Sequence, residues 1–137
     1  MRAPYIALGG LLDQWYEELP WRGEIALGVR GERIAERHLK RCGYIILARN
    51  YRAAGAEIDL IGLDRRTLAF VEVKTRGGEE FGMPQEAVDA GKQDRIRRAA
   101  AAYTEWRRAH GVAIRFDVVA ITGTGRGRRL QVIKDAF

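Results

Sequence analysis

Two neighbouring runs of the chain carry acidic residues and a lysine at alternate positions, which is unusual for strands. The run EIDLIGL contains Glu57 and Asp59, and the run LAFVEVK contains Glu72 and Lys74. Asp and Glu are poor strand formers, and carboxylates that face one another on a sheet repel. A divalent cation offsets this repulsion, and Mg²⁺ can share its remaining coordination positions with water and a phosphate. The pattern therefore indicates a candidate metal site that could act on a phosphate ester.

The connection between the two runs, 64–67, is short and polar, as in a hairpin. A turn centred in this connection places Asp59 opposite Glu72 and Glu57 opposite Lys74. Because side chains two residues apart on a strand share a face, all four project from one side of the sheet. The opposite face then receives apolar side chains that suit a core, namely Ile58, Leu60, Val71 and Val73.

This geometry is suited to phosphodiester hydrolysis. Asp59 and Glu72 could hold the metal, together with the main-chain carbonyl of Val73. Lys74 would then lie beside the scissile phosphate. There it could orient or deprotonate the attacking water and stabilise charge as it develops.

A purely structural arrangement is the alternative for the same residues. Glu57 and Lys74 would form a cross-strand ion pair on an exposed face, and Asp59 would cap a turn. The same face, however, carries apolar side chains closer to the turn, at Ile61, Leu68 and Phe70. Because the face is not simply solvated and strand propensity disfavours acidic residues there, we favour the catalytic interpretation.

The rest of the chain predicts the elements that must position these residues. An amphipathic helix is expected over 26–42, with Gly43 just past its end and Glu32 on the shoulder of its apolar stripe. A second helix is expected over 84–110. Strands are expected at 44–48, 57–63, 68–74, 112–121 and 130–133, with 49–55 as a polar connection and 75–82 as a glycine-rich loop. The predicted class is α/β, in the order α-βββ-α-ββ.

The N-terminal stretch is interpreted as an appendage to this domain. Apolar residues at helical spacing predict a short amphipathic helix that Pro20 ends. These residues are Leu8, Leu11, Leu12, Trp15 and Leu19. We therefore divide the chain into an N-terminal helical extension, 1–24, and one domain, 25–137.

The composition bounds the class of protein. The chain has 137 residues, and its 24 Lys and Arg against 18 Asp and Glu give a net charge of +6, which favours a polyanionic partner. A single cysteine, Cys42, excludes an internal disulfide and a cysteine-rich zinc site, and we expect it to be a small buried hydrophobe. No apolar stretch is long enough to span a bilayer, and acidic residues interrupt the apolar start too early for a signal peptide. We expect a cytoplasmic protein without a membrane partner.

The spacing of Asp59 and Glu72-Val73-Lys74 resembles the PD-(D/E)XK signature of restriction-endonuclease-like nucleases. Over 27–137 the chain is similar to the YraN-type family of small predicted endonucleases. The segments that carry this resemblance are Gly31-Glu32 with Ala35 and Leu39, then NYR at 50–52, EIDLI at 57–61, FVEVKTR at 70–76, Phe81-Gly82 with Pro84 and Lys92, RFDVV at 115–119, and the ending Ala136-Phe137. Ala56 departs from the family pattern, which often has glycine before Glu-Ile-Asp.

The resemblance implies a restriction-endonuclease-like mixed central sheet flanked by helices, as in archaeal Holliday-junction resolvases. It also implies a Mg²⁺- or Mn²⁺-dependent endonuclease acting on DNA, including branched or damaged DNA. By this similarity Asp59, Glu72 and Lys74 are the core catalytic set, completed by Glu32, and the metal ligands are Asp59, Glu72 and Glu32. Secondary roles are expected for Glu57 and Asp117.

Four basic residues are candidates for contact with nucleic acid, namely Lys92, Arg76, Arg95 and Arg52. Lys92 matches a family position near a helix start, and Arg76 lies beside the glycine-rich loop, where a guanidinium can bind a phosphate closely. Charge on an outer helix face is more often simply solvated. DNA is expected more than RNA, and a homodimer would suit a junction-cutting enzyme by analogy of fold.

A catalytically silent nucleic-acid-binding or adaptor module on the same fold is the alternative function. It predicts salt-sensitive binding without cleavage. The complete set of Asp59, Glu72 and Lys74 argues against it, because a chain without turnover would be free to lose one of the three.

Overall fold

The computed structural model describes residues 24–76, 88–123 and 125–137, with side chains from residue 30 onward except that of Arg76. The predicted N-terminal helix and glycine-rich loop therefore lie outside the described residues, apart from Thr75 and Arg76 at the start of that loop. The elements are α2 (Glu24–Arg41), β1 (Ile45–Ala53), β2 (Ala56–Asp64), β3 (Thr67–Arg76), α3 (Ala90–Trp106), β4 (Ala113–Thr122), a 3-10 turn η2 (Gly125–Gly127) and β5 (Arg129–Ile133). The order α-βββ-α-ββ is confirmed.

The strands form one five-stranded mixed sheet in the order β1-β2-β3-β4-β5. Strands β1, β2 and β3 are antiparallel neighbours, β3 and β4 are parallel, and β4 and β5 are antiparallel. A parallel pair needs a long crossover, and α3 lies in the connection between β3 and β4. The expected mixed α/β sheet with flanking helices is thus confirmed.

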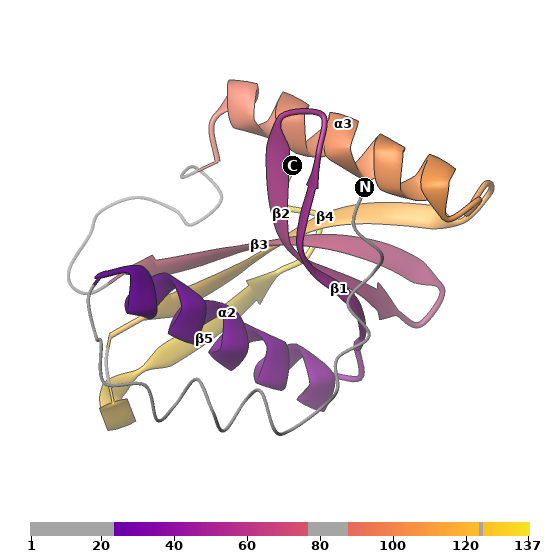
Figure 1. Cartoon of the computed structure of the whole chain (residues 1–137). Helices are drawn as coiled ribbons and strands as arrows, with labels where there is room; N and C mark the ends of the chain where they lie inside the picture. The colour runs from indigo at the N-terminus through magenta and orange to yellow at the C-terminus, as the bar shows by residue number, and fades with distance from the viewer. Residues whose placement is uncertain (1–23, 77–87, 124) are drawn as a thin grey trace.

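The two helices lie on opposite faces of the sheet (Figure 1). Ala35 and Leu39 of α2 pack in one buried cluster with residues of β2, β3 and β4. Ile96 and Tyr103 of α3 pack in a second cluster with residues on the other face of the sheet. Each helix therefore buries one apolar stripe against the sheet, as an amphipathic helix must.

The predicted hairpin register is confirmed from Asp64↔Thr67 to Leu60↔Val71. Arg65 and Arg66 form the two-residue turn. Arg65 has a φ of 57°, a left-handed conformation that costs free energy for a residue other than glycine. The pairing of β2 with β3 ends at Leu60, whereas β2 stays paired with β1 as far as Ala56↔Ala53. The far end of the β1–β2 hairpin thus leaves β3 and lies beside α3 (Figure 1).

This departure of the hairpin corrects one prediction about the faces of β2. Leu60 and Val71 pack on the α2 side as predicted, with Val73 against the same cluster. Ile58, predicted to join them, instead packs in the α3 cluster with Tyr51. The physical reason is that the first residues of β2, before Leu60, pair with β1 and not with β3. The faces to which their side chains point are therefore no longer those of the main sheet.

Other sequence predictions also need correction. The segment 49–55 is not a polar connection, because β1 continues through Ala53 and buried Tyr51 pairs with Ile58. Val88 and Asp89 precede α3 and are not helical, so the helix begins at Ala90 rather than at Pro84, and Asp89 caps it by accepting from the Lys92 N–H at 2.8 Å. Cys42 is exposed rather than buried, since it follows the last residue of α2.

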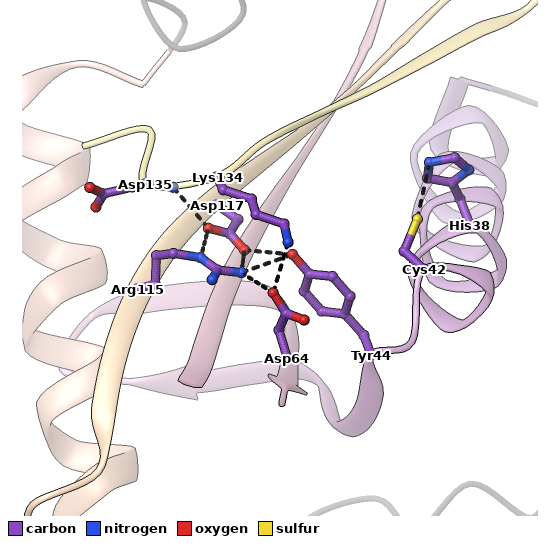
Figure 2. Close-up of polar contacts among 8 residues, drawn as sticks. All are labelled: His38, Cys42, Tyr44, Asp64, Arg115, Asp117, Lys134 and Asp135. Atoms are coloured by element: carbon purple, nitrogen blue, oxygen red, sulfur yellow. Dashed lines mark hydrogen bonds and ion pairs between the residues drawn. The ribbon is translucent and has the colours of Figure 1, made fainter. Parts of the chain in front are cut away.

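Asp117 lies at the centre of a buried polar cluster at the turn end of β2 (Figure 2). Its carboxylate accepts from the Tyr44 hydroxyl at 3.0 Å, from the Arg115 guanidinium at 2.7 and 2.8 Å, and from the Asp135 N–H at 3.0 Å. Arg115 and Lys134 both also contact Asp64 at 2.9 Å. Two carboxylates thus face two cations, and the cluster ties the C-terminal residues to β4 and β2.

The Asp117 cluster predicts a graded loss of stability. Asp117→Ala leaves partly buried Arg115 without its main counter-charge and is expected to lower the free energy of unfolding by about 3–5 kcal/mol. Tyr44→Phe removes a hydroxyl that donates to Asp117 and accepts from Arg115, and it is expected to cost about 1.5–3 kcal/mol. Urea denaturation at neutral pH measures both. The control Asp94→Ala, at an exposed pair with Arg98, should stay within about 0.5 kcal/mol of wild type; an equal loss in all three variants would contradict the prediction.

Candidate metal centre

The position of Glu32 depends on how closely α2 approaches β3. Gly31 faces Thr75, and a Cβ at residue 31 would overlap the Thr75 hydroxyl. Glycine therefore permits a close approach of helix and strand that a larger residue would prevent. The next residue, Glu32, is half-buried and lies close to the start of β2 and the end of β3.

Asp59 lies where β2 and β3 separate, one residue beyond the last strand pair between them. Its carboxylate Oδ2 accepts the Val73 N–H at 2.8 Å. The side chain thereby satisfies a backbone donor that the diverging strand no longer pairs. This bond fixes Asp59 beside Glu72, the neighbour of Val73.

Three carboxylates from two elements converge at this point. One oxygen each of Glu32, Glu57 and Asp59 lies within 4.8 Å of the others. With its amide nitrogen facing the two glutamates, Asn50 of β1 donates to Glu32 Oε2 and Glu57 Oε1, both at 3.0 Å. Arg52 Nε donates to Glu57 Oε2 at 2.8 Å. The predicted face of the hairpin and the predicted helical glutamate are thus brought together.

Glu72 forms the buried side of the same centre. Its side chain is 7% exposed, and its Oε1 contacts Lys92 Nζ directly and lies 3.7 Å from Lys74 Nζ. Glu72 Oε2 is buried without a hydrogen-bond partner among the residues that the structure describes. A buried carboxylate oxygen without a partner is costly and needs an explanation.

The charges of this centre perturb the protonation of its acids. Burial, followed by the charge of Glu72, raises the pKa of the Asp59 carboxyl to about 8, although the Val73 N–H opposes this shift. Burial and the charge of Glu57 raise the pKa of Glu32 to about 7, against the hydrogen bond from Asn50. Asp59 and Glu32 are therefore short of positive charge in spite of the two lysines and of Arg52, which pairs with Glu57.

The two lysines respond differently to the same surroundings. Burial and the neighbouring Lys92 lower the pKa of Lys74. Burial also opposes the charge of Lys92, but its hydrogen bond to Glu72 and the negative charge of Glu72 outweigh burial and raise its pKa. Lys92 is thus the principal cation of Glu72, because it contacts Oε1 directly whereas Lys74 Nζ lies 3.7 Å from the same oxygen.

Of the remaining predicted site residues, Arg52 borders this group through Glu57, and Asp117 lies in a separate cluster. Arg95 is exposed on α3, and Arg52 is exposed but paired with Glu57. Arg76 ends β3, and its side chain lies outside the described residues. Asp117 contacts Tyr44, Arg115 and Asp135 in the separate cluster at the turn end of β2, where it also caps a backbone N–H.

Two features of the centre were not predicted from the sequence. Asn50 was assigned to a polar connection, and no spacing signal relates it to Glu32 or Glu57. Lys92 was assigned to the nucleic acid, whereas in the structure it contacts Glu72. The first turn of α3 brings it there because Asp89 caps that helix just before it.

Over the described residues, the fold and the centre define a class: a small α/β domain with a five-stranded mixed sheet, two helices and a carboxylate–lysine centre where two strands separate. Residues 31–121 match the model of "Uncharacterised protein family UPF0102". The chain belongs to this family.

Individual relatives support the same membership. The chain is 44% identical over 110 residues to a UPF0102 protein of Syntrophus aciditrophicus, covering 80% of this chain and 87% of the relative. It is 46% identical over 110 residues to one of Desulfosudis oleivorans, covering 80% and 88%. It is 48% identical over 112 residues to one of Geobacter sulfurreducens, covering 81% and 88%. Within the described part of this chain, neither helix combines the length and apolar character needed to cross a bilayer.

The raised pKa values predict how stability depends on pH without metal. A carboxyl whose folded-state pKa is raised binds its proton more tightly in the folded state. The free energy of unfolding should therefore rise as the pH falls through about 8 for Asp59 and about 7 for Glu32, and level off near their ordinary values. Urea denaturation in EDTA across this range measures the slope.

The variant Asp59→Asn removes the more strongly shifted of these two groups, so its slope should be smaller than that of wild type. Asp94→Asn changes an exposed carboxylate on α3 and serves as the control, with the slope of wild type expected. Equal slopes in wild type and Asp59→Asn would show that Asp59 titrates normally in the folded protein.

Proposed function

We propose that this protein is a Mg²⁺- or Mn²⁺-dependent endonuclease of the restriction-endonuclease-like PD-(D/E)XK type, acting on DNA. One observation carries the proposal: Asp59, Glu72 and Lys74 meet with Glu32 where β2 and β3 separate. These residues come from one helix and two strands, and they match, residue by residue, the set that the sequence resemblance implies.

The residues present fit a divalent cation. Several carboxylates share a half-buried centre, the pKa values of two are raised, and Glu72 Oε2 has no partner among the described residues. Hard oxygen ligands of this kind suit Mg²⁺ or Mn²⁺. Asp59, Glu72 and Glu32 would hold the ion, which when bound supplies Lewis-acid stabilisation of phosphate charge and makes bound water more acidic.

The side chains of the protein have separate roles in this proposal. Val73 fixes Asp59 through its backbone N–H, so the Asp59 carboxylate is held before any ligand binds. Lys74, partly exposed and close to Glu72, can hold a phosphate oxygen or orient the attacking water. Lys92 places a second positive charge at the same carboxylate and can contact the phosphate beside it.

The charge of the chain supports a nucleic acid as the substrate. The net charge is +6 in spite of the acidic centre, so the positive charge lies elsewhere on the molecule. Exposed Arg95, on the same helix as Lys92, is suited to a backbone phosphate. We propose DNA rather than RNA on the resemblance, and a cytoplasmic location on the sequence.

Cleavage of a labelled panel tests the proposal. The panel contains single-stranded, duplex, flap and four-way-junction DNA, and RNA, each with Mg²⁺, Mn²⁺ or EDTA. Wild type should cut at least one DNA substrate only with metal. Glu72→Gln and Lys74→Ala should each lower the rate by at least about 100-fold, because each removes a group that acts on the transition state.

Glu105→Gln is the matched control, since Glu105 is an exposed glutamate near the end of α3 whose side chain lies 3.7 Å from His110. It should cut as wild type does. Cleavage unaffected by Glu72→Gln and Lys74→Ala would refute the assignment. Salt-sensitive DNA binding by wild type without cleavage of any substrate would instead favour the catalytically silent binding module.

A further inference from the structure

We propose that Glu57 is a further ligand of the divalent cation and that Asn50 is the positioning residue that fixes Glu57 and Glu32 for it. This inference rests on the proposed function for the nature of the ion. Glu57, on β2, lies outside the set of Asp59, Glu72 and Glu32 that the proposed function already assigns to the ion. Asn50 lies on the edge strand β1.

The position of Glu57 supports its role as a ligand. Its carboxylate lies in the same group as those of Glu32 and Asp59, with one oxygen of each within 4.8 Å of the others. Oxygen ligands of one ion must approach one another to about this separation, because metal–oxygen distances are about 2.0–2.6 Å. Glu57 and Asp59 alternate on β2, so the strand presents both from one face.

Glu72 provides an independent sign that a cation belongs here. Only 7% of its side chain is exposed, and one of its oxygens, Oε1, contacts Lys92. The other oxygen, Oε2, has no hydrogen-bond partner within the described residues. Glu72 faces Asp59 and Glu32 closely enough for its charge to act on both. The side chain that carries the unpartnered oxygen is thus a close neighbour of two of the three converging carboxylates, Asp59 and Glu32.

Asn50 is suited to hold two carboxylates without neutralising them. Its side-chain NH₂ has two hydrogens, and it donates to Glu32 Oε2 and Glu57 Oε1 at 3.0 Å each. The neutral amide adds no positive charge of its own, so it orients both acids and leaves the charge of Glu32 available to a cation. The other oxygen of Glu57, Oε2, accepts from exposed Arg52 at 2.8 Å.

The backbone of Asn50 fits this role as well. Its φ of 50° lies in the left-handed region, which asparagine tolerates better than most residues. Asn50 lies between Arg49, paired with Leu60, and Tyr51, paired with Ile58, so in the register of the hairpin it lies opposite Asp59. The amide thereby links β1 to α2 and β2 at the centre.

Titration of the full-length protein with Mn²⁺ by calorimetry, at fixed pH, tests the inference independently of cleavage. Asn50→Gly keeps the left-handed backbone and deletes only the amide, and it should weaken Mn²⁺ binding about 10–100-fold. Glu57→Gln removes the proposed ligand charge and should weaken binding at least as much. Cleavage by Asn50→Gly should return towards the wild-type rate at saturating Mn²⁺, because the amide acts through the ligands.

Ala54→Gly is the matched control. Ala54 also has a positive φ, 52°, and lies in the turn of the same hairpin away from the carboxylates, so this variant relaxes the backbone without touching the centre. It should bind Mn²⁺ as wild type does. Wild-type affinity in Asn50→Gly or in Glu57→Gln, alongside Mn²⁺ binding by wild type, overturns the inference and leaves the proposed function standing. Absence of Mn²⁺ binding by wild type overturns both.

Discussion

The Asp59 carboxylate accepts the backbone N–H of Val73 at the point where β2 and β3 stop pairing. A buried N–H at such a point needs an acceptor, and a side chain here replaces the carbonyl that the diverging strand withdraws. The divergence has two consequences. The end of the β1–β2 hairpin is free to pack beside α3, and Glu57, Asp59 and Glu72 lie where the two strands separate rather than on a continuous ladder. The centre therefore exists because the sheet opens there.

The two ends of β2 differ in the balance between acidic and basic side chains. At the turn end, Asp64 and Asp117 face Arg115 and Lys134, and the hydrogen bonds from Lys134 and Arg115 lower the pKa of Asp64. At the other end, Asp59 and Glu32 have raised pKa values because burial and like charges outweigh the available cations. A balanced cluster of this kind stabilises the fold, whereas an unbalanced one is typical of a binding or catalytic centre.

The strongest local patterns made the fold predictable. Apolar alternation in EIDLIGL and LAFVEVK, with a two-residue polar turn between them, determined the hairpin and its register from Leu60 to Asp64. Edge strand β1 was only half recognised, because NYR at 50–52 lacks the apolar pattern that marks a buried strand. The start of α3 was misplaced because proline suits a helix start, whereas the Asp89 cap determines where this helix begins.

The sequence by itself determined which acids and which lysine share the face of one hairpin, since strand periodicity and a short turn leave little freedom. Only the tertiary structure decided what joins them. Glu32 reaches the centre because Gly31 lets α2 approach β3, and Lys92 reaches Glu72 because the crossover brings the first turn of α3 to the end of that strand. Asn50 of β1 has a left-handed backbone conformation, and its side chain contacts Glu32 and Glu57. Such contacts depend on packing between segments that are distant in the sequence, and local periodicity does not predict that packing.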